Sequence, residues 1–473
     1  MTIGFIIYDL IFLTLFTLAV ILFLYKKRAN LKREGLLYLY RTKVGIKFIE
    51  WTSRKFPKTL YYLQYVVLIS GYTLMVSMIF LLIKFSYFYI TSPIAAKALK
   101  VPVIIPLIPY LPEIFKLDFL PPFYFTYWII IIAIIAIPHE FAHGIFARLN
   151  KIKIHSTGFG FLGPFLAAFV EPDEKKMTKA KKFSQLSVLA SGTFANIICT
   201  IVFALLFWLF FASVFQPAGI TFNSYAMDFI PVSTITSINN IQISSLENAK
   251  KLINESSKFT EAKINGEKIS YFIPTQGLIS ALDGNSESVL AVLDSPAFRA
   301  ELSGAIKSIN GIEIRNIDEL RNELDKYNPG DKIKVITILE NNELNEYNIE
   351  LSEFKGKSFL GIGFIPPQSN GVMGWIYGLI TKIKDPFIYY QSNIGDIGVF
   401  IYHLLWWIVL VNISVALVNM LPLGIFDGGR FFYLTIWGLT GNENIGKRAF
   451  KISTYLILGL IIALMIKWLF IFV

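Results

Sequence analysis

The chain has little of what builds covalent cross-links or a soluble surface. It holds a single cysteine, Cys199, inside an apolar run, which excludes a disulfide framework and a CxxC zinc site. Charged residues make up only 16% of the sequence, whereas 54% is hydrophobic and the mean hydropathy is +0.56. This composition excludes an ordinary soluble globular protein. Histidine is also scarce, since the whole chain has only four.

Apolar runs of membrane-spanning length recur along the chain. We predict six transmembrane helices, because each run can cross a hydrocarbon core of ~30 Å at ~1.5 Å per residue. They cover about residues 3–25, 62–88, 122–148, 184–214, 397–420 and 452–473. The first run has no basic segment before it and is long enough to span. We therefore expect it to remain a membrane helix and not to be a cleaved signal peptide.

The basic residues predict how the chain is oriented. The net charge of +11 does not indicate nucleic-acid binding, because lysine and arginine cluster beside the apolar runs. The clusters lie at 26–61, with eleven basic residues, at 148–183, with eight, and at 447–451. By the positive-inside rule all three are cytoplasmic, and alternation of the spans places both termini, the loop 89–121 and residues 215–396 outside. We expect a multi-pass protein of the cell membrane.

The stretch from 215 to 370 is different in kind, because apolar and polar residues alternate there as in strands of a soluble domain. It contains a repeat, in which ITSINNIQISSLENAKKLI (235–253) is similar to IKSINGIEIRNIDELRNEL (306–324). Each copy is typical of a strand, an Asn-Gly-type turn, a strand and an amphipathic helix. This order resembles a PDZ domain and predicts one or two PDZ-like domains, with a generic α/β insert as the alternative.

Two features qualify this region. The loop after DSPAFRAELSG (294–304) lacks the Gly-Asp usual in PDZ domains, so possible binding of a peptide carboxylate stays open. The following stretch, 371–396, is apolar and aromatic but interrupted by glycine, aspartate and proline. We interpret it as an interfacial helix on the outer face and not as a span.

The third apolar run ends in AIPHEFAHGIF (136–146), which places His139, Glu140 and His143 in a membrane helix. Histidines four residues apart lie on one helix face and can bind one zinc ion, while the glutamate between them can reach a water bound there. The alternative is that the histidines only bond backbone groups. We favour the metal site, because ionisable residues within a bilayer are costly and usually functional.

Zinc in a catalytic site needs a third protein ligand. Asp427, in VNMLPLGIFDGGR, follows the fifth run on the cytoplasmic side and therefore lies at a compatible depth. Pro422 and the glycines around Asp427 would break the helix there and direct the carboxylate inward. The alternative is a solvated aspartate in an Asp-Gly turn.

These motifs together resemble a known family. HEFAH inside a span, GPFLAAFVEPDE (163–174), ASGTFANI (190–197), a PDZ-like insert and NMLPLGIFDGG (419–429) are similar, in this order, to the site-2 protease family of intramembrane metalloproteases. The resemblance implies one zinc ion on His139, His143 and Asp427, with Glu140 as the base. Gly424 and Phe426 depart from the family's usual residues, but neither would supply a metal ligand.

The resemblance also implies roles for three further parts of the chain. Residues 160–171 would form a membrane-embedded hairpin. The glycine-rich backbone of GFGFLGPFLAAFV (158–170) is itself tolerated at membrane depth only if it is buried or lines a cavity, so we expect an extended strand there to pair with the unwound substrate. Asn196 and Asn419 would lie near the active site, where either could hydrogen-bond the substrate backbone or the oxyanion. For each asparagine, an interhelical hydrogen bond is the alternative.

The sequence thus predicts a multi-pass α-helical membrane protein of about six transmembrane helices with an inserted extracytoplasmic α/β region. We expect a zinc metalloendopeptidase that cleaves transmembrane protein substrates within the bilayer, with its active site near the cytoplasmic side. The alternatives are another intramembrane HExxH protease or a non-proteolytic membrane protein that binds or transports metal. The expected divisions are 1–121 (two spans), 122–214 (first part of the catalytic core), 215–284 and 285–370 (PDZ-like domains), 371–396 (interfacial helix) and 397–473 (second part of the core).

Overall fold

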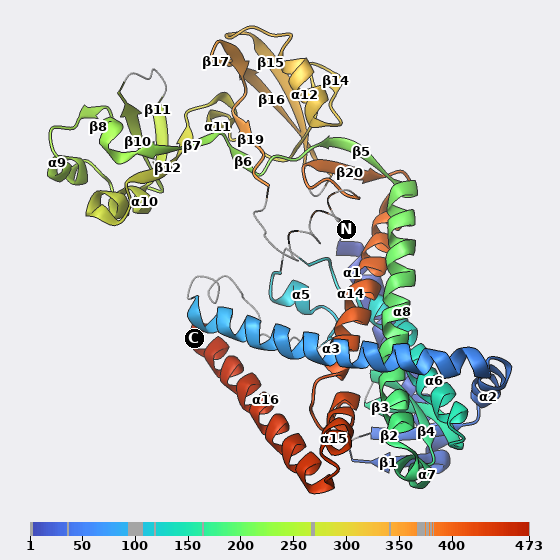
Figure 1. Cartoon of the computed structure of the whole chain (residues 1–473). Coiled ribbons are helices and arrows are strands. Elements are labelled where there is room, and N and C mark those ends of the chain that lie inside the picture. The colour runs from blue at the N-terminus through green and yellow to red at the C-terminus, as the bar shows by residue number, and fades with distance from the viewer. Residues whose placement is uncertain are drawn as a thin grey trace. The chain divides into compact units, whose positions relative to one another are not determined.

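The computed structural model of the chain divides into two compact units. The first comprises Met1–Phe211 and Val399–Val473, and the second comprises Ala212–Gly398 (Figure 1). The structure describes residues 3–35, 37–92, 107–117, 120–162, 165–265, 270–339, 342–366 and 383–472, together with Gly374, Gly378 and Thr381.

Within the described residues, six helices are long and apolar enough to cross a membrane. They are α1 (Ile3–Lys27), α3 (Pro57–Thr91), α6 (Phe125–Leu149), α8 (Lys182–Val214), α14 (Asp396–Asn419) and α16 (Glu443–Phe472). These helices confirm the six predicted runs, so the chain is a multi-pass membrane protein with an inserted strand-rich region. The shorter helices of the first unit are α2 (Ile46–Lys55), α5 (Leu111–Ile114), α7 (Glu174–Lys179) and α15 (Asp427–Thr440).

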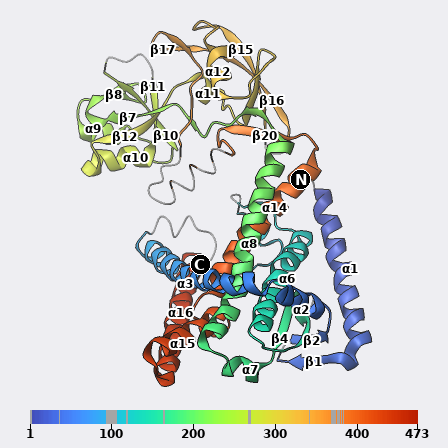
Figure 2. The same ribbon diagram turned by 45° about the vertical axis from the view of Figure 1, so that its right-hand side comes forward.

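The first unit also contains an antiparallel sheet of four strands in the order β1-β2-β3-β4, which are labelled in Figure 1. Figure 2 shows β1, β2 and β4 of this sheet from another side. The strands are β1 (Leu31–Glu34), β2 (Leu37–Thr42), β3 (Ile154–Leu162) and β4 (Phe165–Pro172). The residues expected to form a hairpin, 160–171, include the end of β3 and nearly all of β4, which pair with each other, while residues 163 and 164 lie outside the described part of the chain. The first basic connector adds β1 and β2 to this pair of strands, which the sequence pattern did not predict.

Small residues let the helices of the first unit approach closely. A Cβ atom on Gly71 of α3 would lie 2.8 Å from the Cβ atom of Ala190 on α8, and a Cβ atom on Gly144 of α6 would lie 2.8 Å from Cδ1 of Ile49 on α2. Such glycines are the usual means of close helix packing in membranes, where the hydrophobic effect does not drive helices together. The helices α2, α3 and α8 are thereby held around the core in which α6 lies.

A buried carboxylate joins α1 to the start of α6. Asp9 accepts hydrogen bonds from the backbone nitrogens of Phe125 (2.7 Å) and Thr126 (2.9 Å). The hydroxyls of Thr126 and Tyr110 also donate to it, each at 2.5 Å. Because the first N–H groups of a helix have no partner within the helix, Asp9 caps α6 from another helix.

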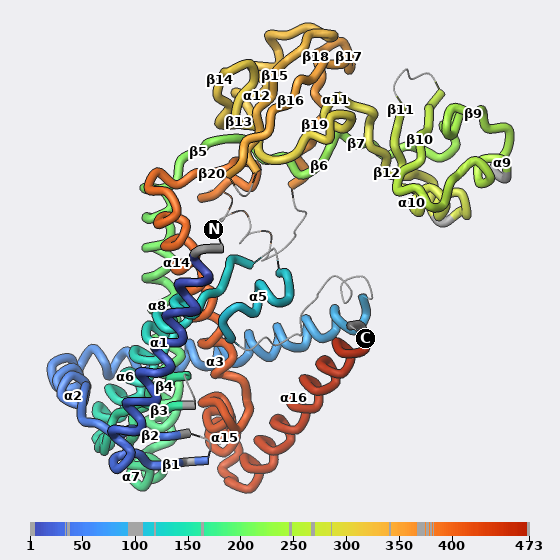
Figure 3. The backbone as a smooth tube through the Cα atoms, turned by 180° about the vertical axis from the view of Figure 1, so that it is seen from behind, coloured from blue at the N-terminus to red at the C-terminus, as the bar shows by residue number. Residues whose placement is uncertain are grey.

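The helices α3 and α16 meet at their C-terminal ends (Figure 3). Lys467 of α16 donates from Nζ to the carbonyl oxygens of Tyr89 (2.9 Å) and Ile90 (3.0 Å). The last carbonyl groups of a helix lack partners and attract cations, so this lysine is a favourable cap for α3.

The second unit contains two six-stranded sheets, each with its own core. The first has the order β7-β12-β11-β10-β8-β9, and the second has the order β16-β15-β13-β5-β20, with β14 paired to β13. The strands of the first sheet are β7 (Met227–Pro231), β8 (Ile235–Ile238), β9 (Ile241–Gln242), β10 (Phe259–Ile264), β11 (Ser270–Pro274) and β12 (Ser288–Leu293). Those of the second are β5 (Phe215–Ile220), β13 (Ala305–Ile309), β14 (Ile312–Glu313), β15 (Lys332–Ile338), β16 (Leu344–Glu350) and β20 (Ile388–Ser392). Short strands and helices complete the unit: β6 (Ser224–Tyr225), β17 (Ser352–Phe354), β18 (Lys357–Phe359), β19 (Ile362–Gly363), α9 (Leu246–Lys251), α10 (Thr275–Ser280), α11 (Pro296–Arg299) and α12 (Ile317–Leu324).

Both copies of the predicted repeat form a strand, a turn, a strand and a helix. In the first copy Ile238 pairs with Ile241, and in the second Ile309 pairs with Ile312. The two residues of each turn have positive φ, namely Asn239 and Asn240 in one and Asn310 and Gly311 in the other. Positive φ at both positions is the geometry of the two-residue type I′ hairpin, which asparagine and glycine favour.

The boundary predicted at 284/285 would place the strands of 215–284 in one sheet and those of 285–370 in another. The structure exchanges one strand in each direction. The strand β5 opens the stretch 215–284 but pairs with β13 and β20 of the second sheet, whereas β12 opens the stretch 285–370 but pairs with β7 and β11 of the first. The pairings of β5 with β13 and β20, and of β12 with β7, join strands distant in sequence, and a local repeat carries no signal for them.

The interfacial helix expected at 371–396 differs from the structure at its C-terminal end. Residues 388–392 form strand β20, which pairs with β5 directly before α14 begins. Gly374, Gly378 and Thr381 are helical, and the other residues between 371 and 382 lie outside the described part of the chain.

Candidate metal centre

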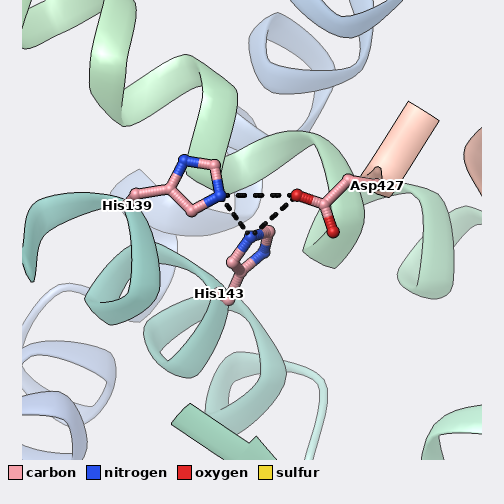
Figure 4. A group of neighbouring side chains, drawn as sticks. All are labelled: His139, His143 and Asp427. Atoms are coloured by element: carbon pink, nitrogen blue, oxygen red, sulfur yellow. Dashed lines mark hydrogen bonds and ion pairs between the residues drawn. The ribbon is translucent and has the colours of Figure 1, made fainter. Parts of the chain in front are cut away.

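The two histidines of the HExxH motif lie one turn apart on α6 and turn their imidazoles toward each other (Figure 4). The Nε2 atoms of His139 and His143 are 3.1 Å apart. Oδ2 of Asp427, the first residue of α15, lies 3.4 Å from Nε2 of His139 and 3.3 Å from Nε2 of His143. Three side chains from two helices distant in sequence thus place one ligand atom each around a common point.

The spacing of these three atoms fits a tetrahedral zinc ion. Ligand atoms about 2.0–2.1 Å from zinc at tetrahedral angles lie about 3.3–3.4 Å from one another. The observed edges of 3.1, 3.3 and 3.4 Å match this value. Among the described residues, His139, His143 and Asp427 form the one group of three or more potential ligands that meets in this way. Two histidines and a carboxylate leave the fourth position open for a water or a substrate oxygen.

Glycines after Asp427 bring its carboxylate to this point. A Cβ atom on Gly428 would collide with the backbone of Met420 and Leu421, and one on Gly429 would collide with the carbonyl group of Leu423. The start of α15 therefore packs against the backbone that follows α14, at a separation that only glycine permits. Gly428 and Gly429 lie within the first turn of α15, so they do not break a helix there but let it begin close to this backbone.

Glu140 lies beside strand β4. Its Oε2 accepts a hydrogen bond from the backbone nitrogen of Val170 at 2.9 Å. In an antiparallel strand both backbone groups of a residue face the same edge, and this alternates along the strand. Because β4 is the last strand of its sheet, the Val170 N–H points to the edge away from β3, and the backbone groups of Ala168 and Leu166 face the same edge.

Ion pairs hold the base of the β3–β4 hairpin. Arg41 of β2 donates from Nε (2.9 Å) and Nη2 (3.1 Å) to the carboxylate of Glu171, and the hydroxyl of Ser156 donates to it at 2.5 Å. The hydrogen bonds from Arg41 and from Ser156 hold the pKa of Glu171 below its usual value. Glu174, just after β4, pairs with Arg430 of α15 at 3.3 Å, which links the hairpin to the helix that carries Asp427.

The structure separates the two asparagines suggested by the sequence. Asn196 of α8 is fully buried, and its Nδ2 lies 3.1 Å from Nδ1 of His139. Asn419 is the half-buried last residue of α14, and among the described residues no hydrogen bond to its side chain is seen. Asn196 therefore contacts Nδ1 of His139, the ring nitrogen that does not face Asp427. Asn419 lies eight residues before Asp427, and its amide group could hydrogen-bond a substrate.

The sequence reasoning missed three groups around the site. The first is the Val188 carbonyl oxygen, which lies 2.7 Å from Nδ1 of His143. The second is the Val170 N–H, which donates to Glu140. The third is Gly192, whose lack of a side chain leaves room beside both histidines. The first two are backbone groups, which nearly every residue has, so the sequence could not indicate that these particular ones contact the site. Gly192 and Asn196 did have a signal, since they lie four residues apart on α8, as the two histidines do on α6.

Comparison with known proteins agrees with this geometry. Residues 126–464 match the sequence model of Peptidase family M50, which spans all the residues of the candidate site. A zinc metalloprotease named RasP, from Shouchella clausii, is 23% identical over 193 residues, which cover 33% of this chain and 44% of RasP. The chain thus spans less than half the length of this curated relative.

Proposed function

Because the chain belongs to Peptidase family M50, we propose that it is an intramembrane zinc metalloprotease that hydrolyses peptide bonds within or near transmembrane segments. The match to this family over most of the chain supports the proposal, as does the name of the similar protein RasP. One observation carries it: His139, His143 and Asp427 meet at tetrahedral spacing beside Glu140, within a framework of apolar helices.

We assign one zinc ion to His139, His143 and Asp427. When bound, zinc supplies Lewis-acid chemistry, since it acidifies a water molecule and polarises a carbonyl group. The carboxylate of Glu140 accepts the proton of the attacking water and returns it to the leaving nitrogen. The Val170 N–H holds one oxygen of that carboxylate, so the position of the base is tied to strand β4.

The outer edge of β4 is our candidate for the substrate cradle. A transmembrane helix hides its peptide bonds in internal hydrogen bonds, so the segment to be cleaved must first become extended. An extended segment can add to the free edge of a sheet by pairing with its backbone groups. Ala168 and Leu166 offer theirs on the edge that also faces Glu140. A substrate strand here would therefore run beside the base.

We assign substrate contact to Asn419, whose half-buried amide group would donate a hydrogen bond to the substrate backbone or to the oxyanion. The sequence suggested the same role for Asn196. Its complete burial against His139 favours a different role for that residue, which is taken up below.

We further propose that the chain lies in the cell membrane with the metal centre toward the cytoplasm. The basic connector 148–183 follows α6, which carries the histidines, and the basic cluster 447–451 follows α15, which carries Asp427, so both support this orientation. The strand-rich insert would then lie outside the cytoplasm. We infer that its two repeats are PDZ-like domains that restrict access for substrates with bulky outer domains and bind a peptide segment of them.

Two matched variants test the proposed activity. Glu140→Gln should keep zinc and lower the cleavage rate of a model transmembrane substrate by about 10²–10⁴-fold, because only the proton acceptor is lost. Asp427→Asn should weaken zinc binding, because it removes the charge of the third ligand. Bound zinc and cleavage are measured together in the purified full-length protein, with Asp173→Asn as a control at an aspartate outside the site. Cleavage that survives Glu140→Gln would refute the proposal.

A further inference from the structure

One face of α8 matches the spacing of the HExxH histidines. Val188, Gly192 and Asn196 follow one another at intervals of four residues, so they lie on the same side of α8 one turn apart. His139 and His143 are also one turn apart, on the facing helix α6. Each histidine therefore meets its own residue of α8, and Gly192 lies between the two contacts.

The contact at His143 fixes the tautomer of its ring. Nδ1 of His143 lies 2.7 Å from the Val188 carbonyl oxygen. A carbonyl oxygen only accepts hydrogen bonds, so Nδ1 carries the proton and Nε2 presents its lone pair. A histidine that binds zinc through Nε2 needs this state, and it is usually held by such an outer partner.

The contact at His139 becomes favourable once the Asn196 amide is turned over. Nδ2 of Asn196 faces Nδ1 of His139 at 3.1 Å, and the amide oxygen Oδ1 has no hydrogen-bond partner among the described residues. If Nε2 of His139 is the ligand, Nδ1 carries a proton, and two donors would then face each other. A rotation of 180° about the last side-chain bond exchanges the oxygen and nitrogen of the amide with no change in its shape. Oδ1 then accepts from Nδ1–H, and the unpartnered oxygen gains a partner.

Gly192 leaves the space in which the ion would lie. A Cβ atom at this position would be 2.6 Å from Nε2 of His139, and it would lie still closer to Nε2 of His143. Both candidate ligand atoms thus point at the one residue of this face that has no side chain.

We propose that this face of α8 is the positioning template of the metal centre. The Val188 carbonyl orients His143, Asn196 orients His139 through Oδ1, and Gly192 provides the room for the ion. The inference rests on the proposed zinc site and deepens it. It makes Asn196 a positioning residue that acts through His139, in contrast to Asn419, which would touch the substrate.

The test measures zinc affinity in a protein that does not turn over. Full-length chains carrying Glu140→Gln are purified in detergent and titrated with zinc against a chromophoric chelator. Asn196→Leu should weaken zinc binding by about 10–100-fold, the usual effect of losing an outer partner of a ligand. Asn196→Asp, which retains acceptor oxygens, should bind zinc at least as tightly as the parent.

Two control variants separate this effect from general damage to the fold. Asn412 of α14 is equally buried, and its amide donates to the Ile408 carbonyl group of its own helix, so Asn412→Leu should leave zinc affinity unchanged. Gly192→Ala should abolish zinc binding, whereas Gly459→Ala in α16 should not, because a Cβ atom there meets nothing within 4 Å. With cobalt in place of zinc, the absorption bands of Asn196→Leu should also shift, since the His139 ring is no longer held.

Two outcomes overturn the inference. If Asn196→Leu binds zinc like the parent but loses cleavage when Glu140 is restored, Asn196 acts on the substrate. If Asn196→Leu and Asn412→Leu weaken zinc equally, the effect belongs to helix packing. In either case a wild-type protein that binds zinc and cleaves its substrate leaves the proposed function intact, so the two failures are distinguishable.

Discussion

The two units of the chain use polar side chains in opposite ways. In the first unit Asn196 is fully buried on α8, where its amide contacts the His139 ring of the metal centre. In the second unit charged groups form exposed pairs, such as Arg315 with Glu313. Exposed pairs contribute little to stability because solvent screens them. The same chain thus uses polarity for geometry in one unit and for solubility in the other.

This difference predicts where a substitution matters. At the metal centre His143, His139 and Glu140 each contact a particular group, and its loss should change the geometry of the site. In the second unit most charged groups can be exchanged with little effect, because water replaces their partners. The predictions below test this contrast, beginning with the largest expected effect.

Removal of the metal should affect the first unit alone. Chelation should abolish cleavage and lower the temperature at which the first unit unfolds, because an ion held at a thousand times its dissociation constant stabilises the folded state by about 4 kcal/mol. Every tryptophan except Trp375 belongs to this unit, so tryptophan emission reports on it. His139→Ala should lose the response to chelator. A zinc-dependent shift that persists in that variant would place the ion elsewhere.

Proline at the free edge of β4 should separate substrate pairing from zinc binding. Ala168→Pro removes an N–H on the edge away from β3 and should lower cleavage by roughly fivefold or more, since the lost backbone hydrogen bond contributes about 1 kcal/mol. Zinc affinity should not change. Ala168→Val keeps the N–H and is the matched control. Equal cleavage by both variants would contradict substrate addition to β4.

Removal of most of the second unit should change selectivity more than rate. Because the Thr221 N–H donates to the Phe387 carbonyl oxygen at 2.8 Å, residues 222–386 can be replaced by an Asn-Gly turn that keeps the β5–β20 ladder. Zinc affinity and cleavage of a substrate with a small outer domain should stay nearly constant. A substrate with a bulky outer domain, which the parent excludes, should be cleaved severalfold faster. The same selectivity in both proteins would argue against an access filter.

The local parts of the site could be predicted from the sequence, and the long-range parts only in part. HExxH specifies two ligands and a base because its spacing matches one helix turn, and the structure places His139 and His143 accordingly. Asp427 could be predicted as the third ligand only from its expected depth in the membrane and from the family resemblance of NMLPLGIFDGG (419–429). The addition of β1 and β2 to the β3–β4 hairpin had no signal, because strand pairing across more than 100 residues depends on the assembled fold.

The second unit shows the same limit. The repeat predicted both two-residue turns, because asparagine and glycine are the residues that favour the positive φ angles found there. It did not predict that β5 and β12 would join the sheet of the other copy. A strand adds to whichever sheet edge the surrounding chain presents, and that edge is set by residues elsewhere.

The cap that Asp9 provides to α6 bears on the order in which the protein is assembled in the membrane. A carboxylate within an isolated membrane helix costs up to about 3 kcal/mol to insert, the value at the helix centre. That cost persists until α6 arrives with the N–H groups of Phe125 and Thr126. The start of α6 is likewise incomplete without Asp9. Neither helix reaches its most stable state during synthesis until both have been inserted, so the helix that carries the HExxH motif gains its N-terminal cap only in a chain that has kept α1.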